Sequence, residues 1–143
     1  MLVYLCGPID QCTCDEEVFS WRKEATNKLI RAKFNVFDAA SAFTISNRRQ
    51  NYNALYDILS NALIKSNLVF ANIPKTFTVG TFVELHIARE NGIPVYAVID
   101  ASLKNSMTLS ALLSRHGKWF SYWDDAINML ISNHSGEAAL SDE

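Results

Sequence analysis

Short, mainly apolar runs recur along the chain, and segments in which apolar residues have helical spacing separate them. The apolar runs cover residues 1–6, 34–37, 68–71 and 94–99, and a fifth candidate covers residues 119–122. Runs of this length, bounded by glycine, proline, asparagine or aspartate, are typical of buried β-strands. The pattern therefore predicts four strands and favours a fifth.

Helical spacing of apolar residues is clearest after the first run. Acidic residues 15–17 begin this segment, and the inward-facing positions that follow are Val18, Trp21, Ala25 and Leu29. An acidic first turn complements the helix dipole. Further segments with this spacing cover residues 55–63, 82–88 and 123–131. Each of these segments predicts a helix that packs against the sheet.

The remaining stretches are less regular. Residues 39–51 have no clear period and predict a long loop that could hold a helical turn. Residues 101–117 are ambiguous between a loop and a short helix. The helix is suggested by Leu109, Leu112 and Leu113. Asn91-Gly92 is a typical helix end. The small polar residues 134–143 predict a disordered tail.

Strands that are apolar throughout, alternating with helices, indicate a parallel sheet covered on both faces. The predicted fold class is therefore α/β, a small doubly wound (flavodoxin- or Rossmann-like) parallel sheet of about five strands with helices on both faces. A chain of 143 residues fits one such domain, which we place at residues 1–133.

Composition narrows the function classes. A net charge of −2 argues against a nucleic-acid polymer as partner, because such a surface needs a basic face. No apolar run is long enough for a membrane span, and no secretory signal is recognisable, so we expect a cytoplasmic protein without a membrane partner. Cys6, Cys12 and Cys14 do not match a zinc spacing, so we expect reduced thiols and no metal site.

In doubly wound sheets, ligands bind beyond the carboxyl ends of the strands. Polar side chains that the predicted strands bring to this edge, or close to it, are Tyr4, Asp10, Asp38, Asn72, Thr78, Thr81 and Glu84. A single glycine in the loop before Glu84 excludes a phosphate loop and a dinucleotide fingerprint, which need several. No serine or cysteine has an obvious histidine partner in the sequence.

Glu84 is the residue that looks out of place, because it falls in the otherwise apolar helical segment 82–88. Gly80 and Thr81 are expected to begin this helix, which would put Glu84 in or near its first turn. There the helix dipole would hold the carboxylate ionised, as suits a nucleophile or a general base. The alternative is that Glu84 only caps the first-turn amides. A reaction that naturally uses a carboxylate nucleophile is displacement at the anomeric carbon of a sugar.

Four pieces of the sequence resemble the nucleoside 2-deoxyribosyltransferase-like family, which includes nucleoside 5'-monophosphate N-glycosidases. They are Val3-Tyr-Leu-Cys-Gly-Pro8, Trp21-Arg22, the segment from Asp57 to Asn72, and Gly80-Thr-Phe-Val-Glu-Leu-His-Ile-Ala88 with Gly92-Ile-Pro-Val95. The resemblance implies that Glu84 is the nucleophile that carries a covalent deoxyribosyl intermediate and that Tyr4 orients it. It also implies a homodimer or higher homo-oligomer, a small nucleoside or nucleotide as partner, and no cofactor.

The substrate-binding residues expected around this pair lie on the loops at the sheet edge: Gly7, Pro8, Asp10, Asp38, Asn72, Thr78, Gly80 and Thr81. Two positions depart from the family pattern. Thr78 replaces the acidic residue six before the glutamate, and Asn67 replaces the aspartate that commonly starts the strand segment. Asp10 or Asp38 could supply the missing acid.

The activity favoured by the motifs is transfer of the sugar of a 2'-deoxynucleoside to another base or to water. A first alternative is hydrolysis of a nucleoside 5'-monophosphate, whose phosphate would be read by hydroxyl and amide groups of residues 76–81 and by Arg22 or the Arg48-Arg49 pair. The arginines also fit solvated surface charge. A second alternative is a nucleotide-binding module without catalysis, which the two departures motivate. His86 is expected to be a core or interface residue, and Trp21 a core residue.

Overall fold

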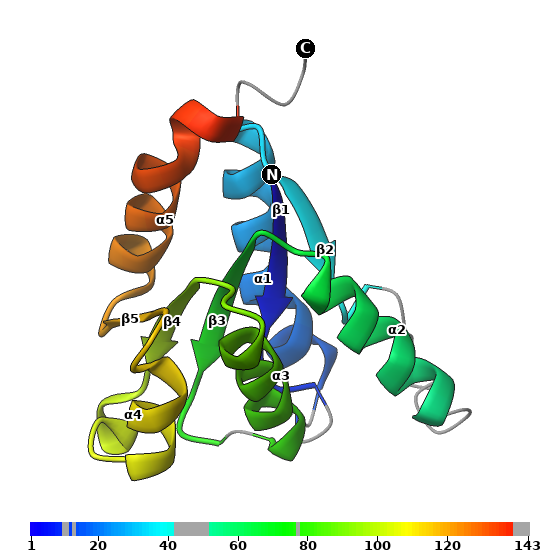
Figure 1. Ribbon diagram of the computed structural model, residues 1–143, viewed down its shortest axis with the longest axis vertical. Helices are drawn as coiled ribbons and strands as arrows, with labels where there is room; N and C mark the ends of the chain where they lie inside the picture. The colour runs from blue at the N-terminus through cyan, green and yellow to red at the C-terminus, as the bar shows by residue number, and fades with distance from the viewer. Residues whose placement is uncertain (10–11, 13, 42–51, 77, 139–143) are drawn as a thin grey trace.

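Five parallel strands form one sheet, and helices cover both of its faces (Figure 1). The computed structural model describes residues 1–9, 12, 14–41, 52–76 and 78–138. The strands are β1 (Leu2–Cys6), β2 (Asn35–Asp38), β3 (Leu68–Ile73), β4 (Val95–Ile99) and β5 (Gly117–Phe120). The helices are α1 (Asp15–Arg31), α2 (Tyr52–Ile64), α3 (Val79–Glu90), α4 (Met107–Leu113) and α5 (Trp123–Ala138), and a short 3₁₀ helix, η1, spans Ala101–Leu103.

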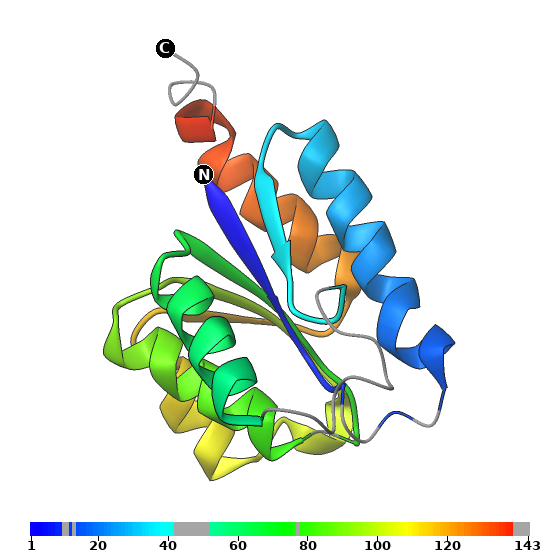
Figure 2. The same cartoon turned by 90° about the vertical axis from the view of Figure 1, so that its right-hand side faces the viewer.

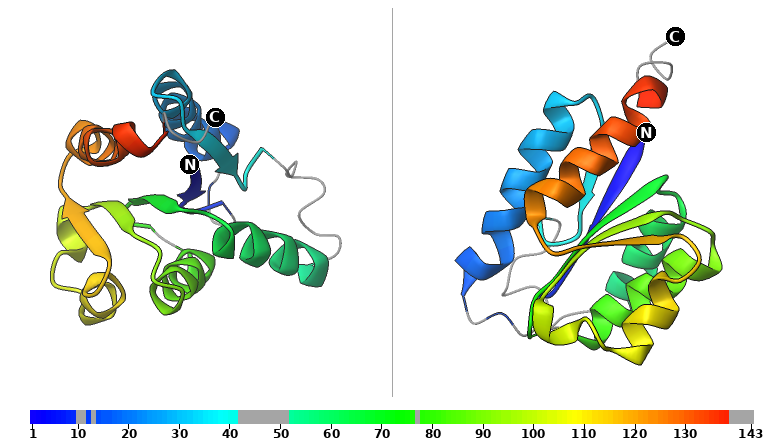
Figure 3. Two further views of the ribbon diagram at one scale, coloured as in Figure 1. Left: turned by 45° about the horizontal axis from the view of Figure 1, so that its top comes forward. Right: turned by 90° about the vertical axis from the view of Figure 1, so that its left-hand side faces the viewer.

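The strand order is β2-β1-β3-β4-β5, and every neighbouring pair is parallel. This is the flavodoxin-like order, so the predicted doubly wound α/β class is confirmed. Helices α1 and α5 lie on one face of the sheet and α2, α3 and α4 on the other, as Figure 2 and both views of Figure 3 show. The order reverses between β1 and β3, and ligands of such sheets bind near that point.

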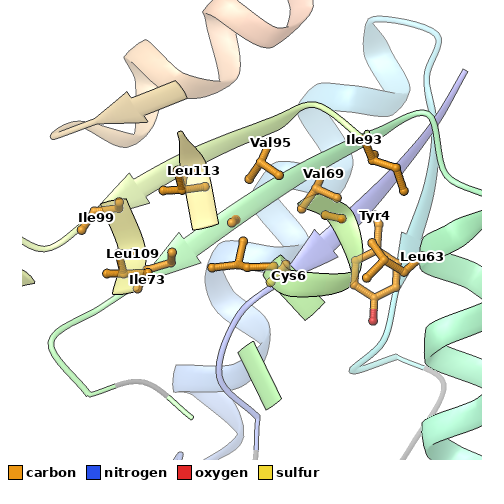
Figure 4. Packing of buried hydrophobic residues seen from close by; sticks show 14 of the residues in the cluster. Tyr4, Cys6, Leu63, Val69, Ile73, Ile93, Val95, Ile99, Leu109 and Leu113 are labelled. Atoms are coloured by element: carbon orange, nitrogen blue, oxygen red, sulfur yellow. The ribbon is translucent and has the colours of Figure 1, made fainter. Parts of the chain in front are cut away.

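The core consists of two apolar layers, one on each face of the sheet. Tyr4 and Cys6 belong to the layer beneath α2, α3 and α4, which Figure 4 shows, whereas Val3 and Leu5 belong to the layer beneath α1 and α5. Because successive residues of a strand point to opposite faces, a strand covered on both sides is apolar at nearly every position. This explains the continuous apolar runs in the sequence.

In the C-terminal part of the chain, element boundaries differ from expectation. Strand β5 begins at Gly117, two residues before the expected run, and pairs with Val95 at that position. The ambiguous stretch 101–117 holds both η1 and α4. Helix α5 continues through Ala138, so residues 134–138 of the expected tail are helical, whereas residues 139–143 lie outside the described part. His134 joins this end of α5 to the sheet, since its Nε2 lies 3.0 Å from the Tyr96 hydroxyl.

The Asn91-Gly92 pair ends a helix, as the sequence predicts. Helix α3 ends at Glu90, followed by Asn91 and by Gly92 with a φ of 67°, a conformation that favours glycine.

Among the described residues, no helix is both long and apolar enough to cross a membrane.

Candidate functional site

Tyr4 and Glu84 meet although 80 positions separate them in the sequence. The Tyr4 hydroxyl donates a hydrogen bond of 2.7 Å to Oε1 of Glu84. Tyr4 comes from the middle of β1 and is fully buried, whereas Glu84 comes from α3 and is half-buried. The structure therefore places an oriented and partly accessible carboxylate on the α3 side of the sheet, beside the reversal of strand order.

The groups around this carboxylate keep their protons. Burial, and then the negative charge of Glu84, raise the pKa of Tyr4 far above its usual range. The same two causes raise the pKa of the buried Cys6 thiol, whose sulfur lies 4.0 Å from the carbonyl oxygen of Thr81. A phenol and a thiol that stay neutral can donate to an anion without forming an ion pair with it.

Helix α3 begins earlier than the sequence suggested. Val79 is its first residue and Thr78 is its N-cap, so the expectation that Gly80 and Thr81 begin the helix is wrong. The Thr78 hydroxyl accepts from the Thr81 amide at 3.3 Å and lies 3.2 Å from the Thr81 hydroxyl. Counting from Val79, Glu84 is the sixth residue and belongs to the second turn. The dipole effect is confined to the first turn, so the bond from Tyr4 is the better explanation for a stable carboxylate.

The α3 surface is also less buried than its apolar sequence suggested. Leu85 and Ala88 point into the core, whereas Glu84 and Ile87 are half-buried and His86 is exposed. The core interpretation of His86 is therefore wrong, and the interface interpretation stays a prediction.

Glu84 lines a small cavity between α2 and α3. The cavity has a volume of about 180 Å³. Apart from Glu84, Ser60 and Gly80, its walls are apolar or aromatic side chains: Tyr56, Leu59, Leu63, Val79, Val83 and Ile87. A carboxylate at the wall of a mainly apolar cavity is a candidate reactive group.

A second carboxylate, Asp38, lies at the end of β2 and is bound by an arginine. Nη1 of Arg22 donates to Oδ1 of Asp38 at 2.8 Å and to the Leu5 carbonyl at 3.1 Å, and its Nη2 donates to the Gly7 carbonyl at 2.9 Å. Oδ1 of Asp38 also accepts from the Ala40 amide at 3.0 Å. Arg22 is only 1% exposed, so its interpretation as surface charge or phosphate reader is wrong.

A signal for this burial was present in the sequence. Arg22 lies four residues after Val18 and three before Ala25, on the apolar stripe of α1. A charged residue on the apolar stripe of a helix must find partners inside the fold. Here the partners are the carbonyls at the end of β1 together with Asp38.

Three of the expected substrate-binding residues line two separate cavities. Gly80 lines the cavity of Glu84, whereas Pro8 and Asn72 line another of about 550 Å³ beside α1. The other walls of this larger cavity are Cys12, Glu17, Trp21, Pro74, Lys75, Thr76 and Asp100. We call it the Trp21 cavity.

Some expected site residues have a different place or lie outside the description. The carbonyl of Gly7 is used by Arg22, and Thr78 and Thr81 are buried at the start of α3. Asp10 and the Arg48-Arg49 pair lie outside the described residues. Within the described ranges, no three His, Cys, Asp or Glu residues gather in a group that could hold a metal ion.

Comparisons with known proteins place the fold. No family model and no curated protein sequence matches the chain. A 2-deoxyribosyltransferase from the bacterium Bacillus psychrosaccharolyticus has a similar structure, with a TM-score of 0.63 and 17% identity over 90% of this chain and 91% of that one. The CMP N-glycosidase BcmB of Clostridium botulinum gives a TM-score of 0.59 and 15% identity over 91% of this chain and 98% of that one.

A conserved protein from Enterococcus faecalis V583 is also similar, with a TM-score of 0.67 and 16% identity over 93% of this chain and 98% of that one. All three likenesses span nearly the whole of both chains. The structure thus has the fold seen in a deoxyribosyltransferase and in a nucleotide N-glycosidase, as the sequence resemblance implied.

Proposed function

We propose that this protein cleaves the N-glycosidic bond of a 2'-deoxynucleoside and transfers the sugar to another base or to water. The observation that carries the proposal is the hydrogen bond of 2.7 Å from the buried Tyr4 hydroxyl to Oε1 of Glu84. It fixes one carboxylate oxygen, so that the second oxygen of the same group has a defined direction of attack. The small cavity at Glu84 and the shared fold support the same assignment.

The reaction has two displacements at the anomeric carbon. In the first, a Glu84 oxygen bonds to C1' while the bond from C1' to the base nitrogen breaks and its electron pair stays on the base, which takes up a proton. In the second, a base nitrogen or a water oxygen bonds to C1', loses a proton and releases the carboxylate. Tyr4 donates to the ionised carboxylate at the start and end of this cycle, and its raised pKa keeps that donor protonated.

Hydrolysis of a nucleoside 5'-monophosphate is a second candidate, and the start of α3 favours it. The first turn of this helix has no acidic residue, and Thr78 stands where the family pattern has one. Backbone amides at a helix N-terminus attract a phosphate, whereas a carboxylate there would repel it. The homo-oligomer implied by the family resemblance stays a prediction.

The decisive experiment is a base-exchange assay on the purified protein. A deoxynucleoside is incubated with a second free base, and a nucleoside 5'-monophosphate is incubated alone, both followed by chromatography. We expect exchange with the wild type and a loss of about 10³-fold or more in Glu84→Ala, because the nucleophile is absent. Glu90→Ala is the matched control, since Glu90 is an exposed glutamate on the same helix and should leave the rate unchanged.

Each result separates the candidates. Cleavage of the monophosphate without exchange on nucleosides would promote the hydrolase. Binding of a nucleotide without turnover of any nucleoside or nucleotide would favour a module without catalysis. Full activity in Glu84→Ala would overturn both enzymatic assignments.

A further inference from the structure

The Trp21 cavity lies on the opposite face of the sheet from Glu84. Trp21 and Glu17 come from α1, which covers the face shared with α5, whereas Glu84 comes from α3 on the other face (Figure 2). The floor of the cavity is formed where β1 and β3 end, by Pro8 and Asn72. Its volume of about 550 Å³ lies in the range of cavities that hold a small organic ligand.

Trp21 supplies the aromatic wall of this cavity, and its ring is held firmly by its neighbours. The Arg22 guanidinium lies 4.6 Å from the ring centroid, and the Phe70 ring lies 6.4 Å away at a tilt of 47°. A Cβ at Gly7 would come within 2.7 Å of the indole, so the glycine permits this position of the ring. A rigid indole with Pro8 and Pro74 nearby is suited to pack against a planar ring.

Asn72 supplies the polar group that can read the edge of such a ring. Its backbone is fixed in β3, paired with Val98 of β4, and its side chain lines the cavity. The Asn72 amide makes no side-chain hydrogen bond within the described part of the chain. An amide offers a donor and an acceptor side by side, which matches heteroaromatic rings that carry an amino group next to a ring nitrogen.

The charges at the rim favour a ligand without a phosphate. Glu17 and Asp100 each contribute a carboxylate and Lys75 contributes one ammonium group, so these three rim residues together carry one net negative charge. A phosphate monoester would bring about two further negative charges to this rim and would be repelled. A neutral ring avoids that repulsion.

We infer that the Trp21 cavity is a second binding site, separate from Glu84, for an uncharged aminopurine or aminopyrimidine base that packs against Trp21 and hydrogen-bonds to Asn72. The inference does not depend on the reaction proposed for Glu84. If that reaction occurs, the Trp21 cavity holds a free base without occupying the cavity of Glu84.

The test follows the indole N–H signal of Trp21 by NMR in the full chain, assigned with Trp21→Phe, while adenine or cytosine is added. We expect a saturable shift of this signal and smaller shifts of the indole signals of Trp119 and Trp123, which do not line the cavity. In Asn72→Leu, which keeps the size of the side chain, the dissociation constant should rise about tenfold or more. Asn128→Leu is the matched control on an exposed position of α5 and should leave the constant unchanged.

Two further arms identify the ligand class and the site. Adenosine 5'-monophosphate should bind at this signal at least about threefold more weakly than adenosine, because of the rim charge. Glu84→Gln should bind adenine as the wild type does, even when all turnover is lost. Absence of a saturable Trp21 shift, unchanged binding in Asn72→Leu, preference for the monophosphate, or loss of binding in Glu84→Gln would each overturn the inference.

Discussion

Two carboxylates lie near β1, and their surroundings are opposite in kind. Asp38 accepts at 2.8 Å from the guanidinium of a fully buried arginine and at 3.0 Å from a backbone amide. Glu84 accepts at 2.7 Å from a phenol whose pKa is raised by burial. The first carboxylate is neutralised by its partner, whereas the phenol that binds the second one is neutral.

This difference indicates which carboxylate is structural and which is reactive. A guanidinium that also binds two strand-end carbonyls fixes the loop after β1 and lowers the nucleophilicity of Asp38. A neutral phenol, by contrast, orients Glu84 at the wall of a cavity. The comparison therefore predicts that changes at Arg22 alter stability, whereas changes at Tyr4 alter the reaction.

Replacing Arg22 by methionine should have the largest effect. It leaves Asp38 and the carbonyls of Leu5 and Gly7 without their donor, and removal of one partner of a buried ion pair typically lowers the free energy of unfolding by about 3–5 kcal/mol. Urea denaturation followed by circular dichroism measures this change. Lys23→Met, at the next and exposed position, should stay within about 0.5 kcal/mol of wild type. A loss below about 1 kcal/mol in Arg22→Met would contradict the structural role of the pair.

Replacing Tyr4 by phenylalanine should come next. The ring still fills its place in the core, but the bond to Oε1 of Glu84 is lost. A hydrogen bond to a charged group is worth about 1.5–3 kcal/mol, so kcat should fall roughly 10- to 100-fold while KM changes little. Steady-state kinetics of base exchange or monophosphate hydrolysis measures both constants.

The matched control is Tyr122→Phe, which removes an exposed phenol outside the cavity of Glu84. It should keep the wild-type kcat. A wild-type kcat in Tyr4→Phe would mean that Glu84 does not need this bond for its orientation.

The sequence predicted the fold best for the strands that are buried on both faces of the sheet. The central strands β1, β3 and β4 are covered on both faces, so their apolar runs stand out from the rest of the chain. Strand β5 lies at the sheet edge and contains the exposed Lys118, which explains why its start was placed two residues too late. The length of α5 was missed because contacts of its end with Tyr96 are tertiary and leave no local pattern.

The site was predictable only in part. The family resemblance brought Tyr4 and Glu84 together, and the structure supports that pairing with a direct contact. Pro8 and Asn72 line a different cavity from Glu84. The sequence could not predict this separation, because it depends on which face of the sheet each crossover helix covers. The start of α3 was misplaced because Thr78 and Thr81 are both acceptable caps, and only the backbone at Thr78 decides between them.

The smallest effect should be a pH dependence of stability that the Tyr4 environment creates at alkaline pH. In the unfolded chain a tyrosine titrates near pH 10, whereas burial and the charge of Glu84 raise the pKa of Tyr4 in the folded protein. Below about pH 10 both states keep the proton, so Tyr4 contributes no slope. Above that pH the unfolded chain releases the proton and the folded chain retains it. The free energy of unfolding should then fall by about 1.4 kcal/mol per pH unit from this residue.

Urea denaturation between about pH 9 and 11 measures this slope. In Tyr4→Phe the slope should be smaller by the contribution of about one proton, because phenylalanine does not titrate in either state. Glu84→Gln should retain most of the slope, since burial is the larger cause of the raised pKa and the charge of Glu84 the smaller one. If Glu84→Gln removed the slope as completely as Tyr4→Phe does, the charge of Glu84 would be the dominant influence on Tyr4. The raised pKa of Tyr4 would then depend more on the charge of Glu84 than on burial. The contrast between this pair and the Arg22–Asp38 pair would then be weaker.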